Sequence, residues 1–246
     1  MSVHVRTLTV VISAAVLMLP ACGAGDADPD VPSPAPAWSQ GAVPTPAQLA
    51  SVLLTGDDLP GQWENTQGRS GIFVFCPQAS AESIEAADAL TWQANVQLDQ
   101  IPAGTATSDA SPSAPIITVD QWLLAEEPSE VEATFTALRD GVQACMGATR
   151  VTSDGVTSPD GVEEVSAAMP VPEVGDDRVG EFDTYPQGFP GSPHAGAPAY
   201  LHTAIIRDGP VLMAINIAEE DASPTGPQLT QADIDAIVTT AAAKLP

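Results

Sequence analysis

The sequence predicts an α+β domain in which an antiparallel β-sheet packs against helices, and three observations lead to this prediction. Polar and apolar residues alternate along Thr91–Ile101, which is the period of a half-exposed antiparallel strand. Only the turn sequence Asp208-Gly209-Pro210 separates Ala199–Arg207 from Val211–Ala218, and this predicts a hairpin. Pro128–Met146 carries apolar residues at three- and four-residue spacing, as a helix with one buried face does.

The elements before residue 126 follow from local signals. Thr45 is the expected cap of a first helix, with Pro46 at its first position, Gln48 completing a capping box and Gly56 ending it. The stretches that follow are expected to form, in order, a turn at Asp57–Gly61, a strand at Ile72–Phe75, a helix at Ser80–Ala89, the alternating strand, and a strand at Ile116–Ala125 that returns beside it.

The elements after residue 126 are expected in the same way. In Pro128–Met146, Ser129 is the expected cap, and the buried stripe consists of Val131, Phe135, Leu138, Val142 and Cys145. Loops are expected at Thr149–Gly161 and Pro186–Pro198, and strands at Glu164–Val171, Arg178–Thr184 and in the hairpin.

The final helix is expected to start at Thr230, with Asp233 three residues later, and to bury Ile234, Ile237, Val238, Ala241 and Leu245. The order helix, strands, helix, strands, helix predicts a layered sandwich with the helices on one side of the sheet.

The N-terminus indicates export. Arg6 precedes an uncharged apolar run, Leu8–Leu19, whose length suits a signal peptide and is too short for a stable membrane span. The Leu19-Pro20-Ala21-Cys22 sequence that follows resembles the lipobox of bacterial lipoproteins, with Pro20 in a place where a small or β-branched residue is usual. The resemblance implies cleavage before Cys22, lipidation of this residue with fatty acyl chains such as palmitate, and anchoring on the extracytoplasmic face of the cell membrane. Ordinary cleavage after Ala24, which would release a secreted protein, is the alternative.

Composition divides the chain into a leader at 1–21, a flexible linker at 22–43 and one globular domain at 44–246. The linker is rich in Pro, Gly and Ala and contains few large apolar side chains, so it cannot offset the entropy of ordering. Prolines bias such a segment toward an extended conformation of about 3.1 Å per residue. Trp38 is the exception in the linker, and we expect it to pack on the domain or to remain loose rather than to contact a membrane.

The charge balance excludes a nucleic-acid partner. The chain has 32 acidic and 7 basic residues, and loss of Arg6 with the leader leaves 32 against 6, a net charge of −26. A domain of this charge repels nucleic acid and anionic headgroups, so a lipid rather than electrostatic adhesion would hold it at a membrane. Solubility explains the acidity; capture of cations or of a basic partner is the functional alternative.

Three cysteines suggest one disulfide bond. If Cys22 is lipidated, Cys76 and Cys145 remain as a pair in an oxidising compartment. The closed loop would contribute about 4 kcal/mol in the loop-entropy model. Two separately buried thiols are the alternative.

No catalytic, metal or cofactor motif is found in the sequence. Lys244 is the only lysine, which leaves no P-loop, and Gly68-Arg69-Ser70-Gly71 does not have the spacing of a serine-hydrolase elbow. His194 is expected in a solvated loop, and His202 is expected as a hydrogen-bonded, half-buried imidazole in a strand. Neither has the further ligands that zinc needs, and Asp154–Glu164 lacks the ligand pattern of an EF-hand. The sequence therefore predicts a protein that is not an enzyme.

A longer stretch of the chain resembles actinobacterial surface lipoproteins, including those related to the extracellular sensor domain of the mycobacterial PknH-type kinases. The carrying features are the Leu53–Gly61 sequence (LLTGDDLPG), the helix that ends in Cys145, the last hairpin and the terminal helix. The resemblance implies an antiparallel sheet flanked by helices and an unidentified small-molecule or protein ligand.

Three functions follow as hypotheses. The first is a lipid-anchored binding or sensor-like module without catalysis, whose ligand surface is expected between the sheet and Pro186–Pro198. The second is a carrier of a lipidic ligand, which would need a large apolar cavity. The third is a cell-wall hydrolase, which would need a deep pocket holding His202 beside a carboxylate and a Ser or Thr.

Overall fold

The structure, a computed structural model, describes residues 38, 42–66, 78–101, 116–152, 162–189, 196–220 and 226–245. Contacts between Cα atoms divide the chain into residues 1–34 and residues 35–246, and all described residues belong to the second unit. No helix among them is long and apolar enough to cross a membrane.

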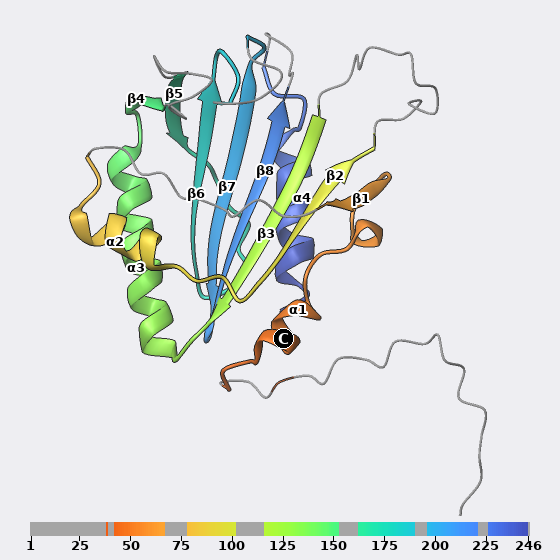
Figure 1. The fold of residues 1–246 in the computed structure, drawn as a ribbon, viewed down its shortest axis with the longest axis vertical. Coiled ribbons are helices and arrows are strands. Elements are labelled where there is room, and N and C mark those ends of the chain that lie inside the picture. Colours follow the sequence, from red (N-terminus) through yellow and green to blue (C-terminus); the bar gives the residue numbers. More distant parts are fainter. Residues whose placement is uncertain are drawn as a thin grey trace, which may run out of the picture. The chain divides into compact units, whose positions relative to one another are not determined.

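The described residues form an α+β fold, as expected from the sequence (Figure 1). The helices are α1 (Pro46–Ala50), the 3-10 helix η1 (Gly56–Asp58), α2 (Ala81–Ala89), α3 (Pro128–Cys145) and α4 (Gln231–Ala242). The strands are β1 (Trp63–Thr66), β2 (Ala94–Gln100), β3 (Ile116–Ala125), β4 (Thr149–Thr152), β5 (Val162–Ala168), β6 (Asp177–Tyr185), β7 (Ala199–Asp208) and β8 (Val211–Glu220).

The strands form one eight-stranded sheet in the order β1-β2-β3-β8-β7-β6-β5-β4, and each neighbouring pair is antiparallel. The predicted pairing of β2 with β3 is confirmed, as is the β7–β8 hairpin, in which Gly209 adopts a φ of 54°. In the left-handed region, glycine has no steric cost, so the turn tolerates this residue best.

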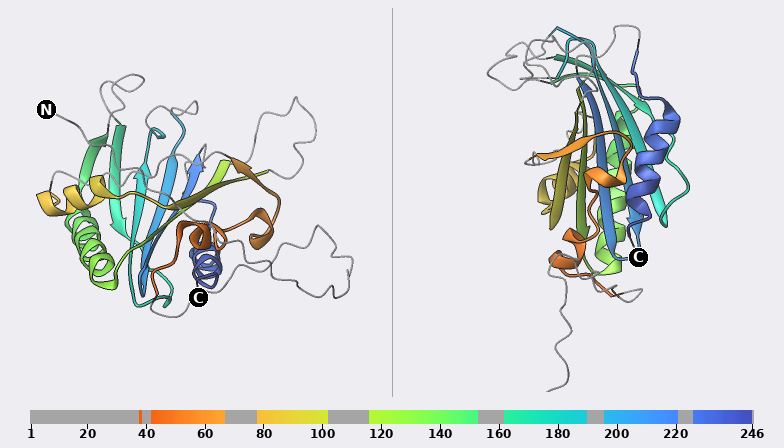
Figure 2. Two further views of the ribbon diagram at one scale, coloured as in Figure 1. Left: turned by 60° about the horizontal axis from the view of Figure 1, so that its bottom comes forward. Right: turned by 90° about the vertical axis from the view of Figure 1, so that its right-hand side faces the viewer.

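Helices cover both faces of the sheet, so the expectation of helices on one side is wrong. Leu49 of α1 and the buried face of α4 pack in one cluster with Leu123, Met213 and other residues that share their sheet face. Val131, Phe135 and Leu138 of α3 pack against Leu124 and Leu212, the adjacent residues, whose side chains point the other way. Figure 1 shows α4 behind the sheet and α3 with α2 at its β4–β6 end, and Figure 2 shows the same arrangement from two other sides.

The helices follow the sequence signals closely except at two termini. The capping box of Thr45 with Gln48 is confirmed, but α1 ends at Ala50, well before Gly56. The predicted stripe of α3 is buried, yet Ser129 is not its cap: Glu127 occupies the N-cap position without a side-chain hydrogen bond, and Pro128 stands first in the helix. Proline fixes the backbone angle φ near its helical value, so the helix starts at Pro128, one residue before the expected cap Ser129.

Two short edge strands were not expected. β1 follows the Asp57–Gly61 turn in a stretch that has no apolar alternation, and β4 forms at the start of the expected Thr149–Gly161 loop. Each lies at an edge of the sheet and pairs with one neighbouring strand. Because neither segment has a strand pattern of its own, pairing with that neighbour rather than local propensity determines these strands. The expected strand at Ile72–Phe75 lies outside the described residues.

Two tryptophans show where the predicted strand and the predicted linker differ from the structure. The alternation along Thr91–Ile101 puts Trp92 on the same face as Ala94, but Trp92 precedes β2 and packs with the α3 cluster on the other face. Trp38 is partly buried and packs against the cluster that contains α1 and α4. The expected packing of Trp38 on the domain is therefore confirmed, and the domain's contacts begin before residue 44.

Candidate functional site

His202 lies on β7 next to a carboxylate of the neighbouring strand. Its Nε2 atom is 3.4 Å from Oε1 of Glu219 on β8, and the two side chains are 8% and 0% exposed. The ring of Phe182 on β6 lies 4.8 Å from the imidazole, and that of Tyr200 lies 5.9 Å from Phe182. Burial and the charge of Glu219 raise the pKa of Tyr200 above its ordinary value. The imidazole is thus hydrogen-bonded, as expected, and more deeply buried than half.

The second oxygen of Glu219 has a structural task. Oε2 accepts hydrogen bonds from the backbone N–H groups of Gln228 at 2.7 Å and Leu229 at 3.2 Å, directly before the Thr230 cap of α4. The carboxylate therefore ties β8 to the start of α4, and no Ser or Thr of the described residues hydrogen-bonds to His202. The arrangement lacks the nucleophile that the hydrolase hypothesis needs. His194 lies outside the described residues.

A row of polar side chains crosses the sheet on the face that carries α3. Directly opposed positions on six neighbouring strands are occupied by Thr66, Gln97, Asp120, Asn216, Thr203 and Glu181. Ile205, two residues from Thr203 on the same face, packs under α3, so the row borders the apolar cluster. Gln97, Thr203 and Glu181 are buried, which the alternation in the sequence did not show. This polar seam is unlike the apolar cavity that a lipid carrier would need.

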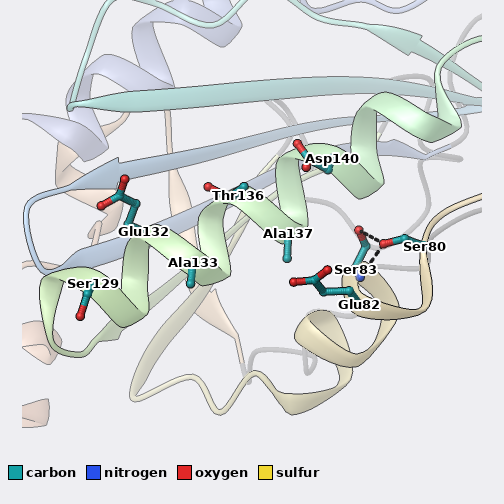
Figure 3. A pocket seen from close by; sticks show the side chains of 9 residues that line it. All are labelled: Ser80, Glu82, Ser83, Ser129, Glu132, Ala133, Thr136, Ala137 and Asp140. Carbon is teal, nitrogen blue, oxygen red and sulfur yellow. Dashed lines mark hydrogen bonds between the residues drawn. The ribbon is translucent and has the colours of Figure 1, made fainter.

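Among the described residues, a groove between α2 and α3 is a candidate site. Its volume is about 400 Å³, within the range of small-molecule sites. Figure 3 shows the side chains that line it: Ser80, Glu82 and Ser83 at the start of α2, and Ser129, Glu132, Ala133, Thr136, Ala137 and Asp140 on α3. The groove lies apart from the surface expected beside Pro186–Pro198, of which residues 190–195 are outside the described part.

The hydroxyl groups at the α2 end of the groove serve the helix. Ser80 Oγ accepts the backbone N–H of Ser83 at 3.1 Å and lies 2.9 Å from Ser83 Oγ, as the dashed lines in Figure 3 mark. This is an ordinary N-cap. The groups left to contact a ligand are the carboxylates of Glu82, Glu132 and Asp140 and the small side chains between them.

The basic side chains that the structure describes are engaged in ion pairs. Arg139 pairs with Asp140, Arg178 with Glu173, Arg207 with Asp176 and Asp177, and Lys244 with Asp58. The hydrogen bond to Asp177 raises the pKa of Arg207 in spite of partial burial. These four cations do not line the groove, so the groove suits a neutral or cationic ligand better than an anionic one.

Of the three cysteines predicted as lipidation or disulfide sites, the structure describes one. Cys22 and Cys76 lie outside the described residues, while Cys145 is completely buried at the end of α3. Among the described residues, no three His, Cys, Asp or Glu side chains gather in a way that could hold a metal ion.

The fold is similar to that of a solved extracellular domain. The extracellular domain of PknH from Mycobacterium tuberculosis superposes with a TM-score of 0.50 over 83% of this chain and 98% of that chain, at 16% sequence identity. No protein-family model and no curated protein matches the sequence. At this identity the likeness concerns the fold alone, an antiparallel sheet flanked by helices.

Proposed function

We propose that the chain is a lipid-anchored, extracytoplasmic binding or sensor-like module without catalytic activity, which holds its ligand in the groove between α2 and α3. The groove is the single observation that supports ligand binding, because it combines a volume of about 400 Å³ with free polar groups from two helices. The similarity of the fold to an extracellular domain supports the location.

The anchor is proposed at Cys22. The lipobox-like sequence and the Pro-rich linker support it, and a net charge of −26 after leader removal leaves no electrostatic means of holding an anionic membrane. We expect the wild-type protein to fractionate with membranes and to carry an acyl mass on Cys22, and the C22A variant to appear in the soluble exported fraction. Equal membrane fractionation of both proteins would refute the anchor.

A disulfide between Cys76 and Cys145 is proposed as the clasp at one end of the groove. This bond would make Cys145 a disulfide-bonded residue rather than a free thiol. Ala79, which precedes α2 and is three residues from Cys76 in the sequence, packs in one cluster with Cys145. Three residues span at most about 10 Å, and a disulfide to Cys145 is compatible with this length. The bond would fix α2 against α3 and so preserve the shape of the groove.

Native mass spectrometry tests ligand binding in the groove. The protein purified from its own host is expected to carry a copurified small molecule. The same molecule should be lost from A133W, in which the indole of an exposed lining residue fills the groove. The matched control is A243W, at the exposed C-cap position of α4, which should retain the ligand. The proposal is wrong if no ligand is found, or if A133W retains it as fully as A243W.

A further inference from the structure

The polar seam lies on a face of the sheet that α3 covers in part. α3 lies at the β4–β6 end of the sheet (Figure 1) and packs on this face against Leu124, Ile205 and Leu212. Beyond that cluster, Asp120 of β3 and Asn216 of β8 are partly exposed, whereas the residues before and after each of them, which point to the α4 face, are buried. The middle of the seam is therefore within reach of a ligand.

Two side chains of the seam have oxygen atoms without a hydrogen-bond partner. In the described part of the chain, Oδ1 of Asn216 and Oγ1 of Thr66 have almost no accessible surface and form no hydrogen bond. Buried polar atoms are nearly always hydrogen-bonded, because an unsatisfied one costs free energy. The next row on the same face follows this rule, since Oδ1 of Asp99 accepts hydrogen bonds from Gln97 at 3.3 Å and from Thr118 at 2.9 Å. The amide of Asn216 can turn about its Cβ–Cγ bond and so present Oδ1 or Nδ2 to a ligand.

The hydrogen-bonding groups of the seam favour an uncharged ligand with many hydroxyl groups. Threonine hydroxyls and carboxamides both donate and accept hydrogen bonds, as sugar hydroxyls do, and carboxylates accept them. Asp120 on β3 and Glu181 on β6 are three strands apart in the sheet, about 14 Å at the usual strand spacing, so they cannot close on one cation. An anion finds no partner here either, because the described cations form ion pairs away from the seam.

The length of the seam favours a linear ligand with repeating units. Its positions lie on the neighbouring strands β1, β2, β3, β8, β7 and β6, and five intervals of about 4.8 Å give a row of about 24 Å. We propose that the polar seam is a second ligand surface, which binds a linear, uncharged oligosaccharide, with Asn216 and Thr66 as ligand-binding residues. The inference does not rest on the groove between α2 and α3, because the two surfaces share no residue.

Nuclear magnetic resonance titration of the ¹⁵N-labelled wild-type protein with linear oligosaccharides of glucose, mannose and N-acetylglucosamine tests the inference. We expect one of these sugars to shift the side-chain N–H₂ signals of Asn216 and Gln97 until the site is saturated. N216A should bind this sugar about tenfold more weakly, because it removes a donor and an acceptor. The matched control is N65A, which removes the same side chain from an exposed position on the opposite face of β1 and should bind like the wild type.

A second variant separates binding from a structural role of Asn216. In the absence of sugar, N216V replaces a group that has no hydrogen bond with a residue that suits a strand, so its urea midpoint should equal or exceed that of the wild type. A lower midpoint would show that Asn216 serves the fold and would overturn the inference.

The remaining outcomes are equally decisive. The inference is wrong if none of the oligosaccharides shifts the Asn216 signal, if N216A and N65A weaken binding equally, or if an uncharged extended peptide shifts the signal and the sugars do not. A133W fills the groove and should keep sugar binding, which supports a separate surface. Loss of sugar binding in A133W would place the sugar in the groove and overturn the inference.

Discussion

At the scale of single residues, Glu219 shows how a buried charge is kept in this fold. Its side chain is fully buried, yet its two oxygens contact the His202 imidazole and two backbone N–H groups. Hydrogen bonds of this kind satisfy a charge that burial would otherwise make costly. The same bonds fix the segment that leads into α4, so the residue acts through the position of that helix.

Substitution of Glu219 should therefore destabilise the domain. Glutamine keeps only one acceptor oxygen and turns an amide N–H₂ toward a donor, so we expect E219Q to lose about 1–3 kcal/mol of unfolding free energy. Urea denaturation followed by circular dichroism measures the difference, with E64Q on the exposed face of β1 as a control that should unfold like the wild type. An unchanged E219Q midpoint would show that the contacts contribute nothing.

Asp58 should give stability a measurable pH dependence. Burial raises the pKa of Asp58, but hydrogen bonds from Lys244 and Thr55 and the charge of Lys244 outweigh burial, so the pKa lies below its ordinary value. Because the unfolded chain binds this proton more readily, the contribution of Asp58 is present above the unfolded pKa and is lost as pH falls through the folded pKa. Wild-type protein should thus lose more stability than D58N between neutral pH and strongly acid conditions.

Urea midpoints at a series of pH values test this prediction. The exposed neighbour provides the control, since D57N should follow the wild-type curve. Parallel curves of urea midpoint against pH for the wild type and D58N would contradict the prediction. They would show that the Lys244 ion pair does not contribute to the stability of the domain.

At the scale of elements, the helices depend on their termini to different degrees. α4 has a complete capping box, in which Thr230 accepts from the N–H of Asp233 and Asp233 accepts from Thr230. The same bonds lower the pKa of Asp233. α3 has no side-chain cap, but eighteen residues and a continuous buried stripe compensate for it.

Removal of the α4 cap should cost stability without changing the fold. We expect T230A to lose about 1 kcal/mol of unfolding free energy, because a first-turn N–H is left without its acceptor. T230S keeps the hydroxyl and should behave nearly like the wild type. Differential scanning calorimetry compares the three proteins, and equal losses in T230A and T230S would assign the effect to the lost methyl group instead.

At the scale of the whole molecule, the scarcity of positive charge bears on stability. Arg139, Arg178, Arg207 and Lys244 each form an ion pair with a carboxylate. The acidic residues far outnumber the basic ones, so the carboxylates that remain give the domain a strong negative field. A domain with so much self-repulsion gains from any covalent constraint. The proposed Cys76–Cys145 bond would close a loop of about 70 residues and is the strongest such constraint available.

Reduction of the domain tests this constraint. A thiol reductant should lower the unfolding free energy of the wild type by about 4 kcal/mol. C76A and C145A should each show this loss without reductant, and the double variant should lose little more than either single one, because one bond is removed in all three. If reductant destabilises C76A as strongly as the wild type, the pairing is wrong.

Local signals in the sequence determined most of the elements. The alternation of β2, the Asp-Gly turn of the hairpin and the capping box of Thr230 each act within a few residues, so the chain around them did not need to be known. For the same reason the stripe of α3, including Cys145, was correctly placed. The acidic composition, likewise, predicted that nucleic acid is not a partner before any fold was known.

Only the tertiary structure decided which face each helix covers, where the edge strands form and where a groove opens. Leu123 and Leu124 are adjacent in the sequence but belong to opposite layers, and nothing local assigns α3 to one layer and α4 to the other. β1 and β4 exist through pairing with distant partners, and the groove exists because α2 lies beside α3, about 50 residues away in the sequence. Contacts between distant segments are set by packing of the whole chain, which no short pattern encodes.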